Sequence, residues 1–151
     1  MSLDIEYQSM SRPAPLWRKV TPHTLVYDGL RWHTRAFCYL RNRFRDFLFA
    51  RIYDIGNIQP DYQIDAKEDT KWHEVLKLRI TPHPGLSDHQ KRIIERDYGM
   101  ENGFKILEVR AAQYFYLERK LMLDENCEER PPKQQQIILA NRDEIIKRIQ
   151  E

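Results

Sequence analysis

The feature that most constrains the fold is the segment Arg31 to Tyr39, RWHTRAFCY, in which small or apolar residues alternate with cationic or aromatic ones. Side chains in a strand point alternately to opposite faces, so the segment is predicted to be a strand with two different sides. One side holds Leu30, Trp32, Thr34, Ala36 and Cys38, and the other holds Arg31, His33, Arg35, Phe37 and Tyr39. The first side, with Trp32, is expected to face a core, and the second to form a cationic sheet face.

A second extended segment, Val20 to Tyr27, precedes this strand and is joined to it through Asp28-Gly29. The Asp-Gly pair is a strong signal for a tight turn, so the two segments are predicted to form a β-hairpin. Alternation also predicts short strands at Leu3 to Tyr7 and at Arg45 to Ile52. Several short strands within about fifty residues favour a small barrel or sheet.

The formal net charge of +2 hides an uneven distribution. Residues 12–51 hold nine Arg or Lys against two acids, a balance of +7, whereas residues 52–151 hold 16 basic and 19 acidic residues, a balance of −3. Like charges on adjacent strands repel, and an anionic partner would relieve that repulsion. Because nearly all of these cations are Arg, whose planar fork matches phosphate, the first half is predicted to bind a phosphate-type anion.

The second half has a different periodicity. Strands are predicted at Trp72 to Ile80, Phe104 to Arg110 and Gln136 to Ala140, with helices starting at Ser87, Ala111 and Asn141. This β-α-β-α-β-α order indicates an α+β unit of roughly eighty residues. The polar stretch that ends at Lys71 reads as a linker, so the predicted division is a barrel domain at 1–56, a linker at 57–71 and a C-terminal domain at 72–151.

The sequence offers no recognisable catalytic or metal-binding motif. It has no Walker loop, nucleophile elbow, HExxH or CxxC pair, and its five His and two Cys lack the spacing of a zinc site. We therefore expect neither an enzyme nor a cofactor. Two Cys do not make a disulfide framework, and no apolar run approaches the ~20 residues of a membrane span, so a cytoplasmic protein without membrane contact is expected.

The first half resembles the WYL domain. The similarity rests on YQSMS and on WRKVTPHTLVYDGLRWHTRAFCYLRNRFRDFLFARI, in which Trp32-His33-Thr34 stands where the name-giving Trp-Tyr-Leu lies and differs from it at two positions. The pattern is most similar to WYL transcriptional regulators found beside bacterial phage-defence islands. Residues 72–151, with TPHPGLSDHQKRIIERDYGM, are similar to the C-terminal extension of those regulators.

This resemblance implies a small Sm-like, SH3-type β-barrel that senses a nucleotide or nucleic-acid effector, followed by a ferredoxin-like α/β domain that helps to form a homodimer. Regulators of this family read DNA through an N-terminal winged helix-turn-helix, and the chain enters a predicted strand within its first few residues. We therefore expect the regulatory part of a longer bacterial repressor, with DNA contacted by that missing domain.

Seven residues are predicted to line an anion pocket on one barrel face: Tyr7, Ser9, His23, His33, Arg35, Arg45 and Arg51. Arg35 and Arg51 are expected to contact phosphate, and Arg45 shares the strand face of Arg51. Ser9 and His23 are expected to supply hydrogen bonds, and the Tyr7 ring a stacking surface. The alternative is an interaction module whose basic face docks an acidic protein or its own DNA-binding domain.

The predicted helix from Ala111 to Leu123 carries a wide apolar stripe of Tyr114, Phe115, Leu117, Leu121 and Met122. Core packing would use part of such a stripe, and a partner could cover the rest. We expect a homodimer held mainly by residues after Trp72.

Overall fold

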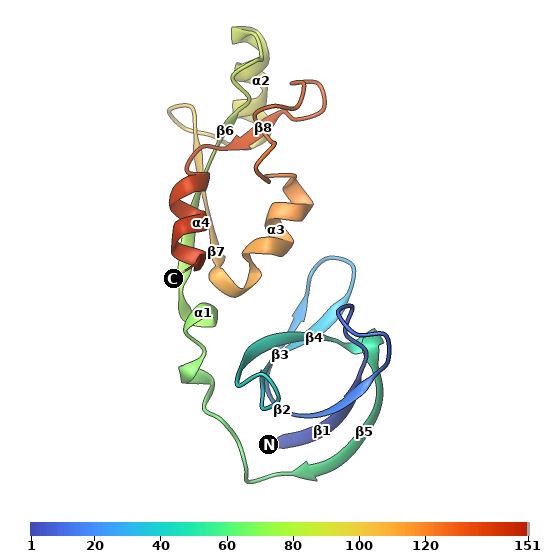
Figure 1. Ribbon diagram of the computed structural model, residues 1–151. Coiled ribbons are helices and arrows are strands. Elements are labelled where there is room, and N and C mark those ends of the chain that lie inside the picture. The colour runs from blue at the N-terminus through green and yellow to red at the C-terminus, as the bar shows by residue number, and fades with distance from the viewer. Residues whose placement is uncertain (151) are drawn as a thin grey trace. The chain divides into compact units, whose positions relative to one another are not determined.

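The computed structural model describes residues 1–150, which form two compact units, Met1–Asp69 and the chain from Thr70 onward. The first unit contains β1 (Ser2–Tyr7), β2 (Leu16–Tyr27), β3 (Trp32–Cys38), β4 (Arg43–Leu48) and β5 (Ile52–Gln59). They pair antiparallel in the order β4-β3-β2-β1-β5, and the sheet curls strongly (Figure 1). Within residues 1–150 β4 and β5 are sheet edges, so the pairing is that of an open sheet and not of a closed barrel.

The predicted hairpin is confirmed. β2 and β3 pair with Tyr27 opposite Trp32, and Gly29 adopts a φ of 96° in the turn between them. The Asp28 carboxylate accepts hydrogen bonds from the backbone N–H groups of Leu30 and Arg31, at 2.9 and 2.7 Å. These bonds stabilise the turn locally, as Asp commonly does at such positions.

The strand predicted from Arg45 to Ile52 is interrupted. β4 ends at Leu48, a 3-10 turn η1 (Phe49–Arg51) follows, and β5 begins at Ile52 and crosses to pair with β1. Arg51 therefore lies in the turn and does not continue the strand face of Arg45. Alternation in the sequence could not reveal this turn, because η1 occupies only three residues between two strands.

Trp32 was predicted to lie in the core, and this is wrong: 53% of its surface is exposed. Trp32 is the first residue of β3 and packs against Tyr27 near the hairpin tip, at 5.2 Å between ring centroids. The core of this unit is formed further along the strands by Ile5, Tyr7, Val20, Ala36, Cys38 and Phe47. The exposure of Trp32 is therefore determined by its position at the end of β3, away from these core residues, and not by the strand face that it shares with Ala36 and Cys38.

The segment predicted as a linker, 57–71, is largely structured. β5 extends to Gln59, a 3-10 turn η2 spans Ala66–Glu68, and helix α1 (Thr70–His73) begins the second unit. The Tyr62 ring stacks on Tyr39 of the first unit, with centroids 5.7 Å apart and planes 27° apart. Residues 60–69 thus belong to the first unit and pack against its sheet.

The second unit contains the predicted succession of strands and helices. Its elements after α1 are β6 (Val75–Pro82), α2 (Asp88–Asp97), β7 (Lys105–Arg110), η3 (Ala111–Gln113), α3 (Tyr114–Leu121), β8 (Ile137–Leu139) and α4 (Arg142–Gln150). Ser87 caps α2 through the expected capping box with Gln90. The sheet order is β7-β6-β8 with antiparallel neighbours. A ferredoxin-like unit has the order β-α-β-β-α-β, so the α+β class is confirmed and that arrangement is not.

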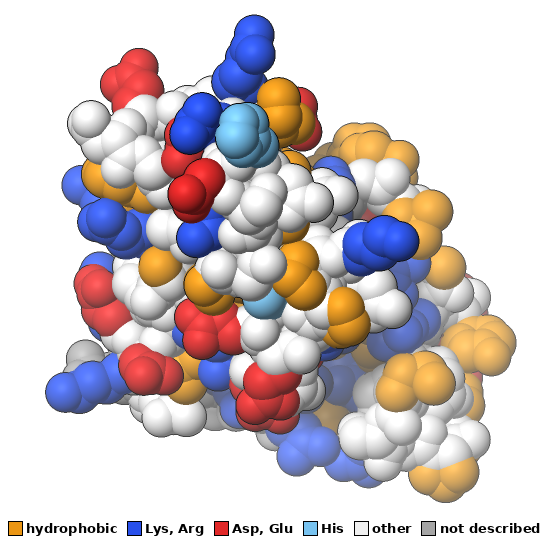
Figure 2. All heavy atoms as spheres, turned by 90° about the horizontal axis from the view of Figure 1, so that it is seen from above, with side chains coloured by type: hydrophobic (Ala, Val, Ile, Leu, Met, Phe, Trp, Pro, Cys, Tyr) orange, Lys and Arg blue, Asp and Glu red, His pale blue; other side chains and the backbone are white. Residues whose placement is uncertain are grey.

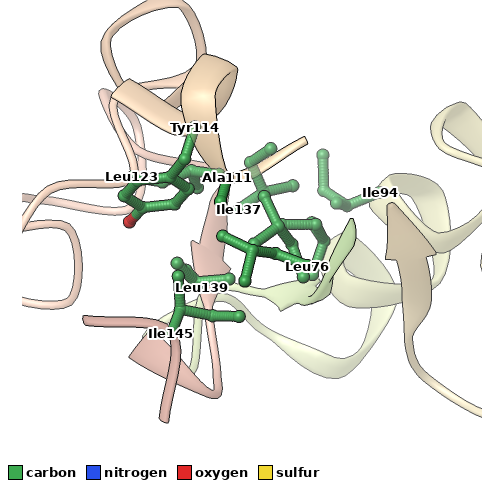
Figure 3. Packing of buried hydrophobic residues seen from close by; sticks show 10 residues of the cluster. Leu76, Ile94, Ala111, Tyr114, Leu123, Ile137, Leu139 and Ile145 are labelled. Atoms are coloured by element: carbon green, nitrogen blue, oxygen red, sulfur yellow. The ribbon is translucent and has the colours of Figure 1, made fainter. Parts of the chain in front are cut away.

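Buried and exposed residues alternate along β6, and the core of the second unit forms on the buried face. Leu76, Leu78 and Ile80 are fully buried on one face of β6. Figure 3 shows Tyr114, Leu123, Ile137 and Ile145, from other segments of this unit, converging on that face together with further residues of the cluster. Burial raises the pKa of Tyr114 well above its usual value. Within residues 1–150, no helix is long and apolar enough to span a membrane.

The apolar stripe predicted along α3 is partly buried in the core and partly exposed. Tyr114 is buried, and Leu117 and Leu121 pack against the core, whereas Phe115 and Met122 are about half exposed. Core packing therefore uses most of the stripe. Phe115 and Met122 remain available on the surface of this unit.

We predict that Leu78→Ala lowers the free energy of unfolding by about 2–5 kcal/mol, because it removes a fully buried side chain and leaves a cavity. Urea unfolding followed by circular dichroism measures this change. Lys77→Ala, at the neighbouring exposed position of β6, should change stability by less than about 0.5 kcal/mol. Equal effects of the two substitutions would contradict the assigned register of β6.

Candidate anion-binding site

A buried arginine lies on the core face of the first unit's sheet. Arg18 of β2 pairs with Ile5 of β1 and, two residues from Val20, points to the same side as the core. Only 5% of its surface is exposed. The Arg18 guanidinium lies 5.4 Å from the Tyr7 ring centroid and 6.0 Å from that of Phe47.

This guanidinium is incompletely satisfied. Within residues 1–150, neither Nε nor Nη2 of Arg18 has a hydrogen-bond partner. Contacts of a cation with aromatic rings compensate part of the loss of hydration, but buried N–H donors need acceptors. The site therefore lacks an acceptor that an anionic ligand could supply.

Further cations lie on the same side of the sheet. Arg45 of β4 is opposite Ala36, and Arg43 is opposite Cys38, so both share the core side with Arg18. Burial lowers the pKa of Arg45, and the positive charges of Arg43, Arg18 and Arg41 lower it further. Arg18, Arg43 and Arg45, named here the Arg18 cluster, thus repel one another, and an anion bound among them would relieve this repulsion.

Three more of the predicted site residues, Tyr7, Ser9 and Arg51, lie at strand ends or turns of this sheet. Tyr7 contacts Phe47 edge to face at 5.0 Å, and its hydroxyl accepts a hydrogen bond from the Leu48 N–H at 3.2 Å. Ser9 is buried just after β1, with its hydroxyl 3.1 Å from that of Ser11. The Arg51 carbonyl in η1 accepts a hydrogen bond from the Gln8 N–H. Tyr7 and Arg45 are thus the two predicted site residues that the structure brings to Arg18.

His23, His33 and Arg35 lie in a different environment. Arg35 pairs with Asp46 across β3 and β4, one position out of step with Arg45, so it points to the opposite face of the sheet. Its Nε and Nη2 donate to Asp69 at 2.8 and 3.0 Å, and its Nη1 donates to Asp46 at 3.3 Å. His23 Nε2 lies 2.9 Å from Asp69, and His33 Nε2 lies 3.9 Å from Asp46.

The expected cationic face is therefore a buried network of opposite charges. Burial acts to lower the pKa of Arg35, but the hydrogen bond with Asp69 and the charge of Asp46 outweigh it, and the pKa is raised. The structure does not bring all seven predicted residues to one pocket, because Arg35 and Arg45 lie on opposite faces. Asp69 could not be assigned to this network from the sequence, since it lies 34 residues after Arg35 in a polar stretch.

The sequence prediction missed Arg18. It started the second strand at Val20, whereas β2 begins at Leu16. With the longer strand, the alternation that places Val20 in the core would also have placed Arg18 there. This alternation between Arg18 and Val20 was the sequence signal that could have predicted a buried Arg18.

The distribution of surface charge and the placement of metal-ligating side chains bear on which other kinds of site the protein could have. On the face seen in Figure 2, Lys and Arg side chains lie among acidic and hydrophobic ones and do not form a uniformly cationic area. Across residues 1–150, no group of three or more His, Cys, Asp or Glu could hold a metal ion. The chemistry that the Arg18 cluster offers is anion binding.

Comparison with known proteins agrees with the two units. Residues 1–56 match the WYL domain, and residues 75–145 match a family described as BrxR transcriptional regulator, C-terminal dimerization domain. The chain is 44% identical over 144 residues to a DNA-binding transcriptional repressor CapW of Escherichia coli strain KTE188, which covers 95% of this chain and 48% of the relative.

Two further relatives carry the same name. The CapW repressor of Pseudomonas aeruginosa is 40% identical and covers 98% of this chain and 49% of the relative. That of Stenotrophomonas maltophilia is 37% identical and covers 96% and 48%. The chain thus spans about half the length of these relatives. It belongs to the WYL-domain transcriptional regulators and carries a WYL domain followed by a BrxR-type C-terminal dimerization domain.

Proposed function

We propose that this chain is the effector-sensing and dimerization part of a DNA-binding transcriptional repressor, and that its WYL domain binds a phosphate-bearing effector, a nucleotide or a nucleic acid, at the Arg18 cluster. The observation that carries this proposal is the buried Arg18 guanidinium, with two nitrogens that lack a hydrogen-bond partner among residues 1–150. A phosphate would supply acceptors to those nitrogens and a negative charge to the three arginines.

The choice of phosphate follows from the residue type and number. Guanidinium groups bind phosphate with two parallel charge-assisted hydrogen bonds, and such bonds are stronger than neutral ones. A carboxylate would satisfy one arginine, whereas a nucleotide or oligonucleotide carries the several charges that Arg18, Arg43 and Arg45 can neutralise together. The Tyr7 ring beside Arg18 supports an aromatic component in the effector. We assign no catalytic step to this chain.

The role in repression is proposed from the relatives. Their printed name is DNA-binding transcriptional repressor, and we propose that a winged helix-turn-helix in the half of such proteins that this chain does not cover contacts DNA. Dimers match two-fold operators, so dimerization by the second unit would set the spacing of two DNA-binding domains. A cytoplasmic regulator of a phage-defence locus fits this proposal. The strand order, with β5 on β1, also supports an Sm-like strand arrangement for the WYL domain, in the form of an open, curled sheet.

We predict that Arg18→Met weakens binding of inorganic pyrophosphate or of short nucleotides at least tenfold, because a charged hydrogen bond contributes about 1.5–3 kcal/mol. The same substitution should keep or raise the melting temperature of the unliganded protein, since it removes a buried cation. Isothermal titration calorimetry and thermal unfolding measure the two effects. Arg12→Gln, at an exposed loop position, is the matched control and should change neither.

The ionic-strength dependence separates nucleic-acid binding from protein docking. A single strand that neutralises Z phosphates should bind with a slope near −0.7Z in log K against log salt. Oligonucleotides and cyclic nucleotides titrated at two salt concentrations provide this slope. If no nucleotide binds at low salt, the proposed effector class is wrong and docking of an acidic protein or of the DNA-binding domain becomes the better hypothesis.

For assembly, we predict that light scattering of the full chain gives twice the chain mass of 18.4 kDa. Residues 70–151, a compact unit with its own core, should dimerize alone, whereas residues 1–69 should remain monomeric. A monomer mass for the full chain across the micromolar range would refute the dimer. Dimerization of residues 1–69 alone would show that the interface lies in the first unit and that the proposed location in the second unit is wrong.

A further inference from the structure

One side of helix α3 exposes two large apolar residues. Phe115, in the first turn of α3, is 55% exposed, and Met122, the C-cap of the helix, is 46% exposed. Seven residues make about two helical turns and span ~10 Å, so the two residues lie on the same side of α3. Phe115 and Met122, named here the α3 seam, are therefore an apolar surface that the core of the second unit does not use.

Two opposite charges lie between these apolar residues. Glu118 and Arg119 follow Phe115 by three and four residues, so they flank the α3 seam on either side. Arg119 is exposed, whereas Glu118 is partly buried, with its carboxylate 3.9 Å from Arg142 Nη2. The order along this side of the helix is therefore apolar, acidic, basic and apolar.

This order is complementary to itself when a copy of the helix is turned through 180°. An antiparallel copy, centred between Glu118 and Arg119, brings Phe115 opposite Met122 of the partner subunit. The same arrangement places Arg119 opposite the partner's Glu118. Thioether–aromatic contacts and opposite charges are both favourable, whereas a parallel copy would place equal charges opposite each other.

Other exposed apolar residues of the second unit do not share this arrangement. Ile93 and Tyr98 lie on α2 and at its C-cap, but they are five residues apart and so point to different sides of the helix. Val75 of β6 and Ile106 of β7 are single exposed apolar residues on their strands. Within residues 70–150, α3 is thus the helix that places two exposed apolar residues on one side.

We propose that the α3 seam is the centre of the dimer interface, where α3 packs antiparallel on α3 of a second copy across a two-fold axis. This inference rests on the proposed function, because the match of residues 75–145 to a dimerization family supports a second copy as the partner. The opposite charges beside the α3 seam favour the antiparallel direction. A stable dimer buries about 1,200–2,000 Å² in total, so surface around α3 completes the interface.

Disulfide trapping in the full chain tests this pairing. The double variant Phe115→Cys/Met122→Cys should give a covalent dimer on mild oxidation, with a 115–122 link identified by mass spectrometry. One helix cannot form this link within itself, because the two positions are ~10 Å apart and bridged Cα atoms lie within about 7 Å. Each single variant should stay at the level of the unmodified chain, whose Cys38 and Cys127 are buried. Efficient dimers from a single variant would contradict the antiparallel direction.

A charge reversal tests the same pairing without altering the apolar residues. Arg119→Glu should raise the dissociation constant of the dimer at least tenfold, because Glu118 then faces a carboxylate across the axis. Sedimentation equilibrium measures this constant. Raising NaCl from about 0.1 to about 1 M should recover part of the lost affinity, since salt screens the repulsion. Lys120→Glu makes the same charge change at the next exposed position, on another side of α3, and should alter the constant less than about twofold.

The outcomes separate the α3 seam from the proposed function. A dimer that forms no 115–122 link and is insensitive to Arg119→Glu would overturn the α3 pairing while leaving dimerization by the second unit intact. The α3 seam would then be covered by another part of the regulator, such as its DNA-binding half. A full chain that is monomeric across the micromolar range would overturn both the pairing and the proposed assembly.

Discussion

Two arginines of one five-stranded sheet, Arg35 and Arg18, have buried guanidinium groups. The two faces of the WYL unit differ in whether this charge is paired with carboxylates. Arg35 is surrounded by carboxylates of Asp69 and Asp46, so its face is closed by an internal network. Arg18 points to the other face, where Arg43 and Arg45 add positive charge. Because a buried charge is costly unless it is paired, the Arg35 network stabilises the packing of residues 60–69. On the other face, two buried nitrogens of Arg18 have no hydrogen-bond partner among residues 1–150.

Much of the fold could be predicted from the sequence because it depends on local patterns. The Asp28-Gly29 turn, the capping box of Ser87 and Gln90, and the alternation along β6 each act within a few residues. The errors arose where the outcome depends on distant segments. Trp32 has the pattern of a core residue, but it is the first residue of β3, near the hairpin tip, and 53% of its surface is exposed. The turn η1 redirects the chain at Arg51 so that β5 can pair with β1.

The sequence by itself determined that the first half carries a strong excess of arginine on alternating strands and that an α+β unit follows it. It also determined that Arg35 and Arg45 are in strands, since their neighbours alternate. Only the tertiary structure decided which arginines are neutralised. Asp69 reaches Arg35 from 34 residues away, whereas Arg18 meets aromatic rings and other cations. Charge pairing depends on distances between segments that lie far apart in the chain, and local patterns do not contain those distances.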